Sequence, residues 1–231
     1  MAGKIKGARA LLSIARAAAL GDACFSHIVR RLRPGLSERE IAADIEAFLL
    51  GNGAEGLAFP TICVSGPNTS LPHGEPGDRR LETGDLLTMD FGAVMEGYCG
   101  DMTRTVAIGR ASREQRKVYR TVRLAQEAAL AAARDGVACS EVDRAARELI
   151  ERAGYGEFFT HGTGHGVGRE VHEKPTLNAK SRETLRENMP VTIEPGIYIP
   201  GKFGVRIEDL AIVAKFGIIN LVRSDKNLIV I

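Results

Sequence analysis

Four of the five histidines occur in two short glycine-containing segments. One segment holds His73, and the other holds His161, His165 and His172. Histidines that only fill a core are dispersed along a chain, whereas histidines that bind metals or transfer protons are brought together. The grouping predicts one chemical site that draws on both segments.

Four carboxylates lie in strand-like sequence around these histidines. Asp90 and Asp101 lie between the two histidine segments, and Glu194 and Glu208 follow them. Because every second side chain of a strand points to the same face, we expect the four carboxylates to share a polar face. Buried like charges are costly unless they are protonated or neutralised by cations. Two divalent ions would balance the four negative charges.

One histidine completes this donor set. His165 adds an imidazole nitrogen to the carboxylate oxygens. A set rich in oxygen with a single nitrogen suits manganese, iron, cobalt or zinc. The residues therefore predict a metal centre.

The elements that position these residues are grouped by type along the chain. Apolar residues follow helical spacing over 11–32 and again over 118–132, and each of these helices precedes a shorter one. Strand-like sequence follows in both cases, over 86–91 and 100–108 and then over 191–199 and 205–213. This order predicts an α+β fold, with helices packed on a largely antiparallel sheet.

The two halves of the sequence also match each other. The segment Arg33-Pro34-Gly35-Leu36 corresponds to Arg134-Asp135-Gly136-Val137, and the apolar positions of the helices that follow correspond as well. We interpret the chain as one domain, residues 1–231, built by internal duplication from pseudo-repeats of about 1–105 and 106–231.

Five motifs in order resemble the pita-bread metallopeptidase family, which includes methionine aminopeptidases, aminopeptidase P and prolidases. They are TMDFG, CGDMTRT, HGTGHGVG with VHE, TIEPGIY and VRIED. The resemblance covers nearly the whole chain and implies the duplicated α+β pita-bread (creatinase/aminopeptidase) fold with a curved sheet. It implies that two metal ions, with Asp101 and Glu208 as bridging ligands, are bound by Asp90, Asp101, His165, Glu194 and Glu208. We expect manganese or cobalt, with zinc or iron as alternatives.

The resemblance also implies catalytic roles. Two metal ions about 3.5–4 Å apart can share a water, lower its pKa and hold a peptide carbonyl for attack. We expect Glu194 to act as the general base that passes the proton to the leaving nitrogen. His73 and His172 match histidines that lie beside the metals and hydrogen-bond the substrate or the tetrahedral intermediate.

Two further residues favour the proline-specific branch of the family. His161, four residues before His165, and Arg206, two before Glu208, are features of aminopeptidase P and prolidases. We predict both as substrate-binding residues in an exopeptidase that hydrolyses an N-terminal Xaa-Pro bond. Alternatively, Arg206 only neutralises the carboxylates and His161 only orients His165. Enzymes of this branch usually carry an N-terminal domain, and we expect none within residues 1–231.

Three other functions remain open. Methionine aminopeptidases are often this short, so methionine removal is the first alternative. Some pita-bread proteins are binding modules without catalysis, but these typically lose metal ligands, and all five are present here. A creatinase-like hydrolase of small molecules needs no complete ligand set and fits less well.

Composition limits the partners. Lys+Arg of 31 against Asp+Glu of 29 leaves a net charge of +2, too small to attract nucleic acid. Runs of uninterrupted apolar residues are too short to predict a membrane-spanning helix. The four cysteines are dispersed and predict no disulfide framework, so we expect a cytoplasmic location. We expect a peptide substrate, no membrane partner and a homodimer.

Overall fold

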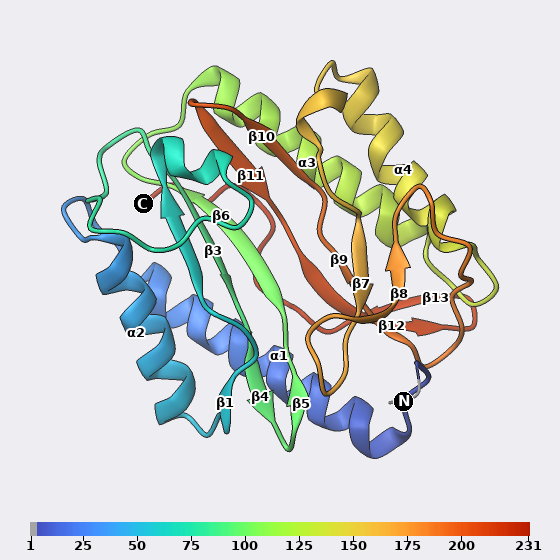
Figure 1. Ribbon diagram of the computed structural model, residues 1–231. Coiled ribbons are helices and arrows are strands. Elements are labelled where there is room, and N and C mark those ends of the chain that lie inside the picture. Colours follow the sequence, from blue (N-terminus) through green and yellow to red (C-terminus); the bar gives the residue numbers. More distant parts are fainter. Residues whose placement is uncertain (1–3) are drawn as a thin grey trace.

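Four long helices flank the central strands in the computed structural model, which describes residues 4–231 of the chain (Figure 1). The helices, with two short 3-10 helices, are α1 (Ala8–Val29), α2 (Glu38–Gly51), η1 (Gly66–Ser70), α3 (Arg113–Ala132), α4 (Cys139–Arg152) and η2 (Gly156–Phe158). The domain expected over residues 1–231 includes residues 1–3, which lie outside the described range. Helices α2 and α3 begin at capping boxes, where Ser37 and Ser112 accept a backbone hydrogen bond from the third helical residue.

The strands form four sheets, and every pairing between named strands in residues 4–231 is antiparallel. The first half contains β1 (Gly56–Leu57), β2 (Ile62–Ser65), β3 (Leu86–Phe91), β4 (Ala93–Met95), β5 (Tyr98–Cys99) and β6 (Met102–Ala107). The second half contains β7 (Gly164–Gly166), β8 (Glu173–Leu177), β9 (Pro190–Ile193), β10 (Gly196–Ile199), β11 (Phe203–Arg206), β12 (Asp209–Ala214) and β13 (Gly217–Asn220). The predicted α+β class is therefore confirmed.

Each half has its own helix pair and its own apolar core. Helices α1 and α2 pack on β2, β4 and β5, and Ile14, Ile45 and Phe91 belong to the buried cluster between them. Helices α3 and α4 pack on strands of the second half, with Val122 and Ile193 in a separate buried cluster. Figure 1 shows the two helix pairs on opposite flanks of the strands. The strands thus lie between two layers of helices.

The two halves repeat the same backbone contacts. In the first half, the N–H of Gly35 donates to the carbonyl of Leu81 at 2.9 Å; in the second, Gly136 donates to Leu185 at the same distance. Both glycines have positive φ, 91° and 82°, a conformation that costs glycine little. The two matched glycine turns thus make equivalent contacts, and the division of the chain into two pseudo-repeats stays a prediction.

Two of the expected strands are each interrupted. The segment predicted over 191–199 divides into β9 and β10, and the segment over 205–213 divides into β11 and β12, with the two parts in different sheets. The first interruption contains Pro195, which cannot donate a hydrogen bond to a ladder. Glu194 and Glu208 therefore lie where the chain changes sheet, and the prediction that they lie within continuous strands is wrong.

Helix α1 is long and apolar enough to cross a membrane, judged by length and composition alone. This differs from the expectation based on uninterrupted apolar runs, because small residues keep the helix apolar between its charges. One face of α1, including Ala17, Phe25 and Ile28, is buried against α2, β4 and β5. Packing within the domain accounts for that apolar face.

Gly164 allows β7 to approach β9 closely. A Cβ at this position would lie 2.0 Å from the carbonyl oxygen of Thr192. We expect Gly164→Ala to lower the free energy of unfolding, measured with urea, by about 1–3 kcal/mol, because the backbone must move apart. Gly56→Ala is the control, since a Cβ there meets nothing within 4 Å. Equal losses in both variants would contradict the close-approach explanation.

Candidate metal centre

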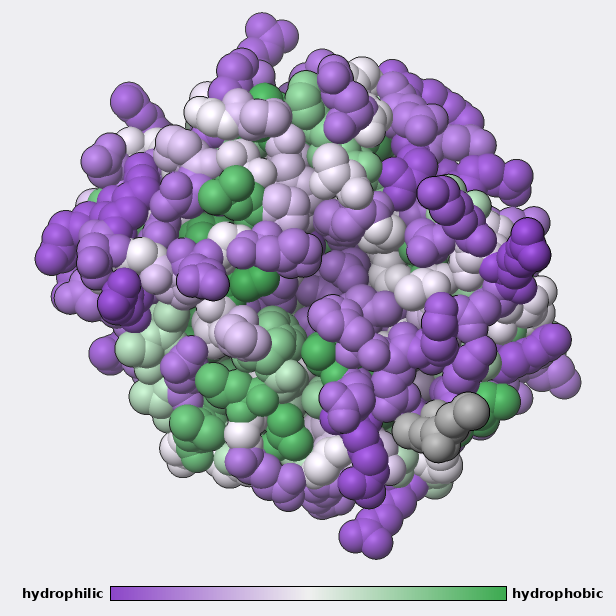
Figure 2. All heavy atoms as spheres, viewed as in Figure 1, coloured by the Kyte–Doolittle hydropathy of each residue, from purple (hydrophilic) through white to green (hydrophobic). Residues whose placement is uncertain are grey.

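One cleft contains all of the predicted site residues. Its volume is about 1100 Å³, and its lining includes His73, Asp90, Asp101, His161, His165, His172, Glu194, Arg206 and Glu208. Figure 2 shows this face of the molecule hollowed near its centre, with hydrophilic surface in the hollow and an apolar area beside it. Residues that are far apart in sequence thus meet in this cleft, between the two helix pairs.

Strand ends position the metal-ligand candidates. Asp90 lies in β3 and His165 in β7, while Asp101 directly precedes β6. Glu194 directly follows β9, and Glu208 directly precedes β12. Because these positions are at or beside the ends of short strands, their side chains reach the cleft while the backbone stays in the sheets. Both halves of the fold supply donors.

Asp101, His165 and Glu208 form the closest donor group. Each offers one ligand atom, and these atoms lie within 4.8 Å of one another. The His165 Nε2 atom lies 3.6 Å from Asp101 Oδ2 and 3.3 Å from Glu194 Oε1. Glu194 therefore joins the group through His165.

The hydrogen bonds of His165 direct a lone pair into the site. Its Nδ1 atom lies 3.0 Å from the carbonyl oxygen of Gly166, which can only accept, so we assign the proton to Nδ1. Burial lowers the pKa of His165, which keeps the ring neutral and leaves Nε2 without a proton. Nε2 and two carboxylate oxygens then face one another as three acceptors. A bound cation would resolve this conflict.

The carboxylates show the same conflict. Burial raises the pKa of Asp101 well above its usual value, and the nearby Glu208 and Asp90 charges raise it further. Burial, followed by the Glu194 and Asp90 charges, raises the pKa of Glu208 in the same way. Asp90 Oδ1 is buried and has no hydrogen-bond partner among residues 4–231. These oxygens need protons or cations.

Arg206 supplies one positive charge to this group. Its Nη2 atom lies 2.5 Å from Asp90 Oδ2, and its side chain is 4% exposed. The remaining nitrogens donate to Thr103, Tyr198 and the carbonyl oxygen of Pro72. The geometry matches the alternative in which Arg206 neutralises a carboxylate. Substrate binding by Arg206 stays a prediction.

His161 belongs to a chain of hydrogen bonds that ends at Arg206. The His161 Nδ1 atom lies 2.7 Å from the carbonyl oxygen of Gly162, and Nε2 lies 2.8 Å from the Tyr198 hydroxyl. Burial lowers the pKa of His161, so the ring is neutral and its Nε2 atom accepts a hydrogen bond that the Tyr198 hydroxyl donates. Neither ring nitrogen is hydrogen-bonded to His165, which does not support the alternative in which His161 orients His165. A substrate role for His161 stays a prediction.

The two other predicted histidines are exposed at the cleft. The His172 ring lies edge-on to the His165 ring, with centroids 4.4 Å apart. The cleft shields His172 from water in part, which lowers its pKa, so this ring is also neutral near pH 7. His73 lines the cleft from the segment after η1. Their catalytic roles stay predictions, although the positions suit groups that meet a substrate.

Three residues that support the site were not predicted from the sequence. The Thr103 hydroxyl donates to Glu208 Oε2 at 2.6 Å, and the Thr192 hydroxyl donates to Glu194 Oε1 at 3.2 Å. Tyr198 joins His161 to Arg206. The two threonines could have been predicted from strand alternation, which places every second side chain on the same face. Thr103 follows Asp101 by two positions, and Thr192 precedes Glu194 by two.

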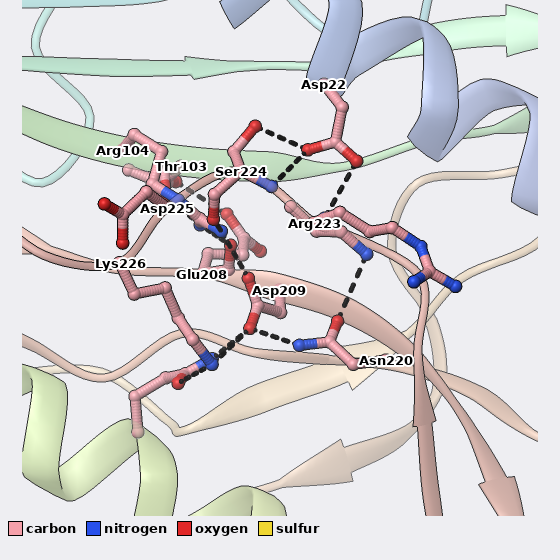
Figure 3. Close-up of polar contacts among 12 residues, drawn as sticks. Asp22, Thr103, Arg104, Glu208, Asp209, Asn220, Arg223, Ser224, Asp225 and Lys226 are labelled. Carbon is pink, nitrogen blue, oxygen red and sulfur yellow. Dashed lines mark hydrogen bonds and ion pairs between the residues drawn. The ribbon is translucent and has the colours of Figure 1, made fainter.

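A buried polar network contacts the backbone of Glu208 (Figure 3). Arg104 Nη1 donates to the carbonyl oxygen of Glu208 at 2.6 Å, and Arg104 Nη2 lies 2.7 Å from Asp209 Oδ1. The side chains of this ion pair are 1% and 0% exposed. Gln126 and Lys226 also donate to Asp209. Arg104 on β6 thus fixes the backbone of a metal-ligand candidate from the other half.

Comparison with known proteins gives the family. The model of metallopeptidase family M24 matches residues 13–215. The chain belongs to metallopeptidase family M24. A Xaa-Pro dipeptidase of Pyrococcus horikoshii is 42% identical over 225 residues, which are 97% of this chain and 64% of that protein. An uncharacterized peptidase of Bacillus subtilis, YqhT, is 42% identical over 98% of this chain and 64% of its own length.

Solved structures of M24 relatives have the same fold. The Xaa-Pro dipeptidase from Bacillus anthracis has a TM-score of 0.97 and 43% identity, over 98% of this chain and 64% of that chain. Prolidase from Pyrococcus furiosus has a TM-score of 0.94 and 41% identity, over 96% and 66%. The pita-bread fold and the family expected from the motifs are therefore confirmed. The chain spans 64% of the length of both curated relatives.

Family membership and geometry agree on a metal. M24 proteins are metallopeptidases, and Asp101, His165 and Glu208 form a candidate metal site. The unprotonated Nε2 of His165, the crowded carboxylates and the orphaned Asp90 oxygen all fit divalent cations.

The Arg104–Asp209 ion pair is expected to be necessary for stability. Arg104→Met removes a positive charge that neutralises the buried Asp209 carboxylate, so we expect the free energy of unfolding, measured with urea, to fall by about 3–5 kcal/mol. Arg144→Met on α4 is the control, because that side chain is 66% exposed and its ion pairs are 4.0 Å long. The control is expected to change by less than about 0.5 kcal/mol. A loss below 1 kcal/mol for Arg104→Met would refute this role.

The crowded carboxylates predict a pH effect on the metal-free protein. In the folded protein the pKa values of Asp101 and Glu208 are raised, so the unfolded chain loses these protons at a lower pH than the folded protein does. The contribution of the two carboxyl groups to the free energy of unfolding therefore falls as pH rises above about 4.5. The lowered histidine pKa values act in the opposite direction, so a matched variant is needed. Relative to wild type, Asp101→Asn/Glu208→Gln should be more stable, and by more at pH 7 than at pH 5.

Thermal unfolding of chelator-treated protein measures this difference. Manganese should raise the midpoint of the wild type, and more at pH 7 than at pH 5, because cations compete with protons for the carboxylates. The double variant should lose most of this response. A double variant that is less stable than metal-free wild type at pH 7 would disprove the repulsion.

Proposed function

We propose that this chain is the catalytic region of a metal-dependent exopeptidase that hydrolyses the bond between an N-terminal residue and proline. One observation carries the proposal: a buried set of carboxylates and one imidazole lies on the floor of a cleft that also presents three other histidines. The two Xaa-Pro dipeptidases compared above support the substrate class. The proposed cofactor is two divalent ions, manganese or cobalt, with zinc or iron as alternatives.

The five donors predicted from the sequence would hold the ions. Asp101 and Glu208, which belong to the closest donor group and come from different halves of the fold, would be shared by the two ions, as expected from the family resemblance. When bound, the ions would supply Lewis-acid polarisation of the peptide carbonyl and a water of lowered pKa. Thr103 and Thr192 donate to Glu208 and Glu194 and hold these carboxylates in place.

Glu194 is the proposed proton carrier. Burial raises the pKa of Glu194, which makes its carboxylate a stronger base than an exposed glutamate. Its Oε1 atom lies 3.3 Å from His165 Nε2, so it would lie close to a metal ion held by His165, which would supply the attacking water. The nitrogen of an Xaa-Pro bond carries no hydrogen and must gain a proton to leave. Glu194 would accept a proton from water and deliver it to this nitrogen.

The histidines are proposed to bind the reacting carbonyl. Partial shielding from water lowers the pKa of His172, so its neutral ring retains one N–H that can donate to the carbonyl oxygen as charge develops there. His73 lines the same cleft. Apolar side chains of Phe59, Ile62 and Val171 also line it and offer surface for a proline ring.

Arg206 and His161 are proposed to set specificity as a connected pair. Tyr198 joins them, and the charge of Arg206 is buried beside Asp90. In a loaded site, the ions would share Asp90 and free part of the guanidinium for a substrate carbonyl or carboxylate. The homodimer and the cytoplasmic location also stay predictions.

A peptide panel tests the proposed function. Protein loaded with manganese or cobalt should cleave Ala-Pro and Ala-Pro-Ala but leave Met-Ala-Ser intact, with products identified by mass spectrometry. A chelator should abolish cleavage, and Glu194→Gln should lower kcat by about 10²–10⁴-fold. Cleavage of Met-Ala-Ser alone would overturn the proline specificity in favour of methionine removal. No cleavage of any peptide would favour a binding module.

A further inference from the structure

A buried ion pair connects the segment before α1 to the cleft. Lys6 Nζ lies 2.6 Å from Glu173 Oε2, and the two side chains are 6% and 11% exposed. The backbone N–H of Lys6 donates to the carbonyl oxygen of Asn188 at 2.9 Å, which fixes the lysine from its other end. The pair therefore joins residues that are 167 positions apart in sequence.

The carboxylate of Glu173 organises the loop of residues 168–173. Its Oε1 atom accepts hydrogen bonds from the backbone N–H groups of Arg169, at 2.9 Å, and Glu170, at 3.4 Å. A Cβ at Gly168 would lie 2.1 Å from Oε1, so the carboxylate occupies the space that a side chain there would need. One oxygen of Glu173 binds Lys6, and the other closes the loop.

This loop carries His172. The residue directly precedes Glu173, and its ring meets the His165 ring edge-on at 4.4 Å. Exposure of His172 leaves its position dependent on the loop backbone rather than on a surrounding core. The Glu173 carboxylate accepts hydrogen bonds from the backbone of the loop, and the Lys6 ammonium group neutralises the charge of that carboxylate.

We propose that Lys6 is a positioning residue for His172, acting through Glu173. Without the ammonium group, the buried Glu173 carboxylate is left uncompensated, turns toward water and releases the N–H groups of the loop. The segment preceding α1 thereby controls the placement of a group that meets the substrate. The inference deepens the proposed function and rests on it for the role of His172.

Kinetics of Lys6→Met test the catalytic consequence. We expect kcat on Ala-Pro to fall about tenfold or more, with KM and the dissociation constant for manganese changed less than threefold. Lys6→Arg keeps the charge and should retain activity. Lys4→Met is the matched control, because Lys4 lies in the same segment as Lys6 but is 47% exposed and pairs with Glu183, which is outside the 168–173 loop.

A double-mutant cycle separates positioning from general damage. In a His172→Ala background, Lys6→Met should cause no further fall in kcat, because the group that it positions is already absent. A full additional tenfold fall would overturn the proposal. So would wild-type kcat in Lys6→Met.

Hydrogen exchange tests the structural step without any activity. Amides in residues 168–173 should exchange faster in Lys6→Met than in wild type and remain unchanged in Lys4→Met. If Lys6→Met does not fold, Glu173→Ala removes the oxygen that accepts from Arg169 and Glu170, so exchange in the loop should also be faster. Unchanged exchange in these variants would overturn the proposal. Faster exchange in a protein that cleaves no peptide would instead refute only the proposed function.

Discussion

Repulsion among buried carboxylates is the constraint on which the rest of the structure depends. Asp101 and Glu208 are 6% and 1% exposed, and each raises the energy of the other in its charged form. Arg206 forms an ion pair with Asp90. The unprotonated nitrogen of His165 adds another acceptor to the group. A fold that gathers these groups in one place is stable near neutral pH when cations bind among them.

Contacts between the two halves of the chain make this gathering possible. Asp90 and Asp101 come from the first half, and His165, Glu194 and Glu208 come from the second. Contacts across the junction hold the halves in register: Thr103 bridges to Glu208 by a backbone pairing and a side-chain hydrogen bond, and Arg104 forms an ion pair with Asp209. The metal-ligand candidates are therefore fixed by the same contacts that join the two cores.

The sequence predicted the family, the fold class and the residues that line the cleft, because these depend on motifs and on periodic apolar spacing. It did not predict that Glu194 and Glu208 lie where the chain changes sheet, since alternation alone does not distinguish one long strand from two short ones. Partners distant in sequence were also missed. The Arg206–Asp90 ion pair, the Tyr198 link and the Lys6–Glu173 pair arise only when separate segments pack together.

The most direct test of the central claim is calorimetric titration of the metal-free protein with manganese at pH 7. The account predicts saturable binding of two ions per chain, with protons released because the ions replace protons on buried carboxylates. Asp101→Asn should bind fewer ions or bind both more weakly. Absence of saturable binding in the folded wild type, or binding unchanged by Asp101→Asn, would contradict the claim that the carboxylate cluster is a metal centre.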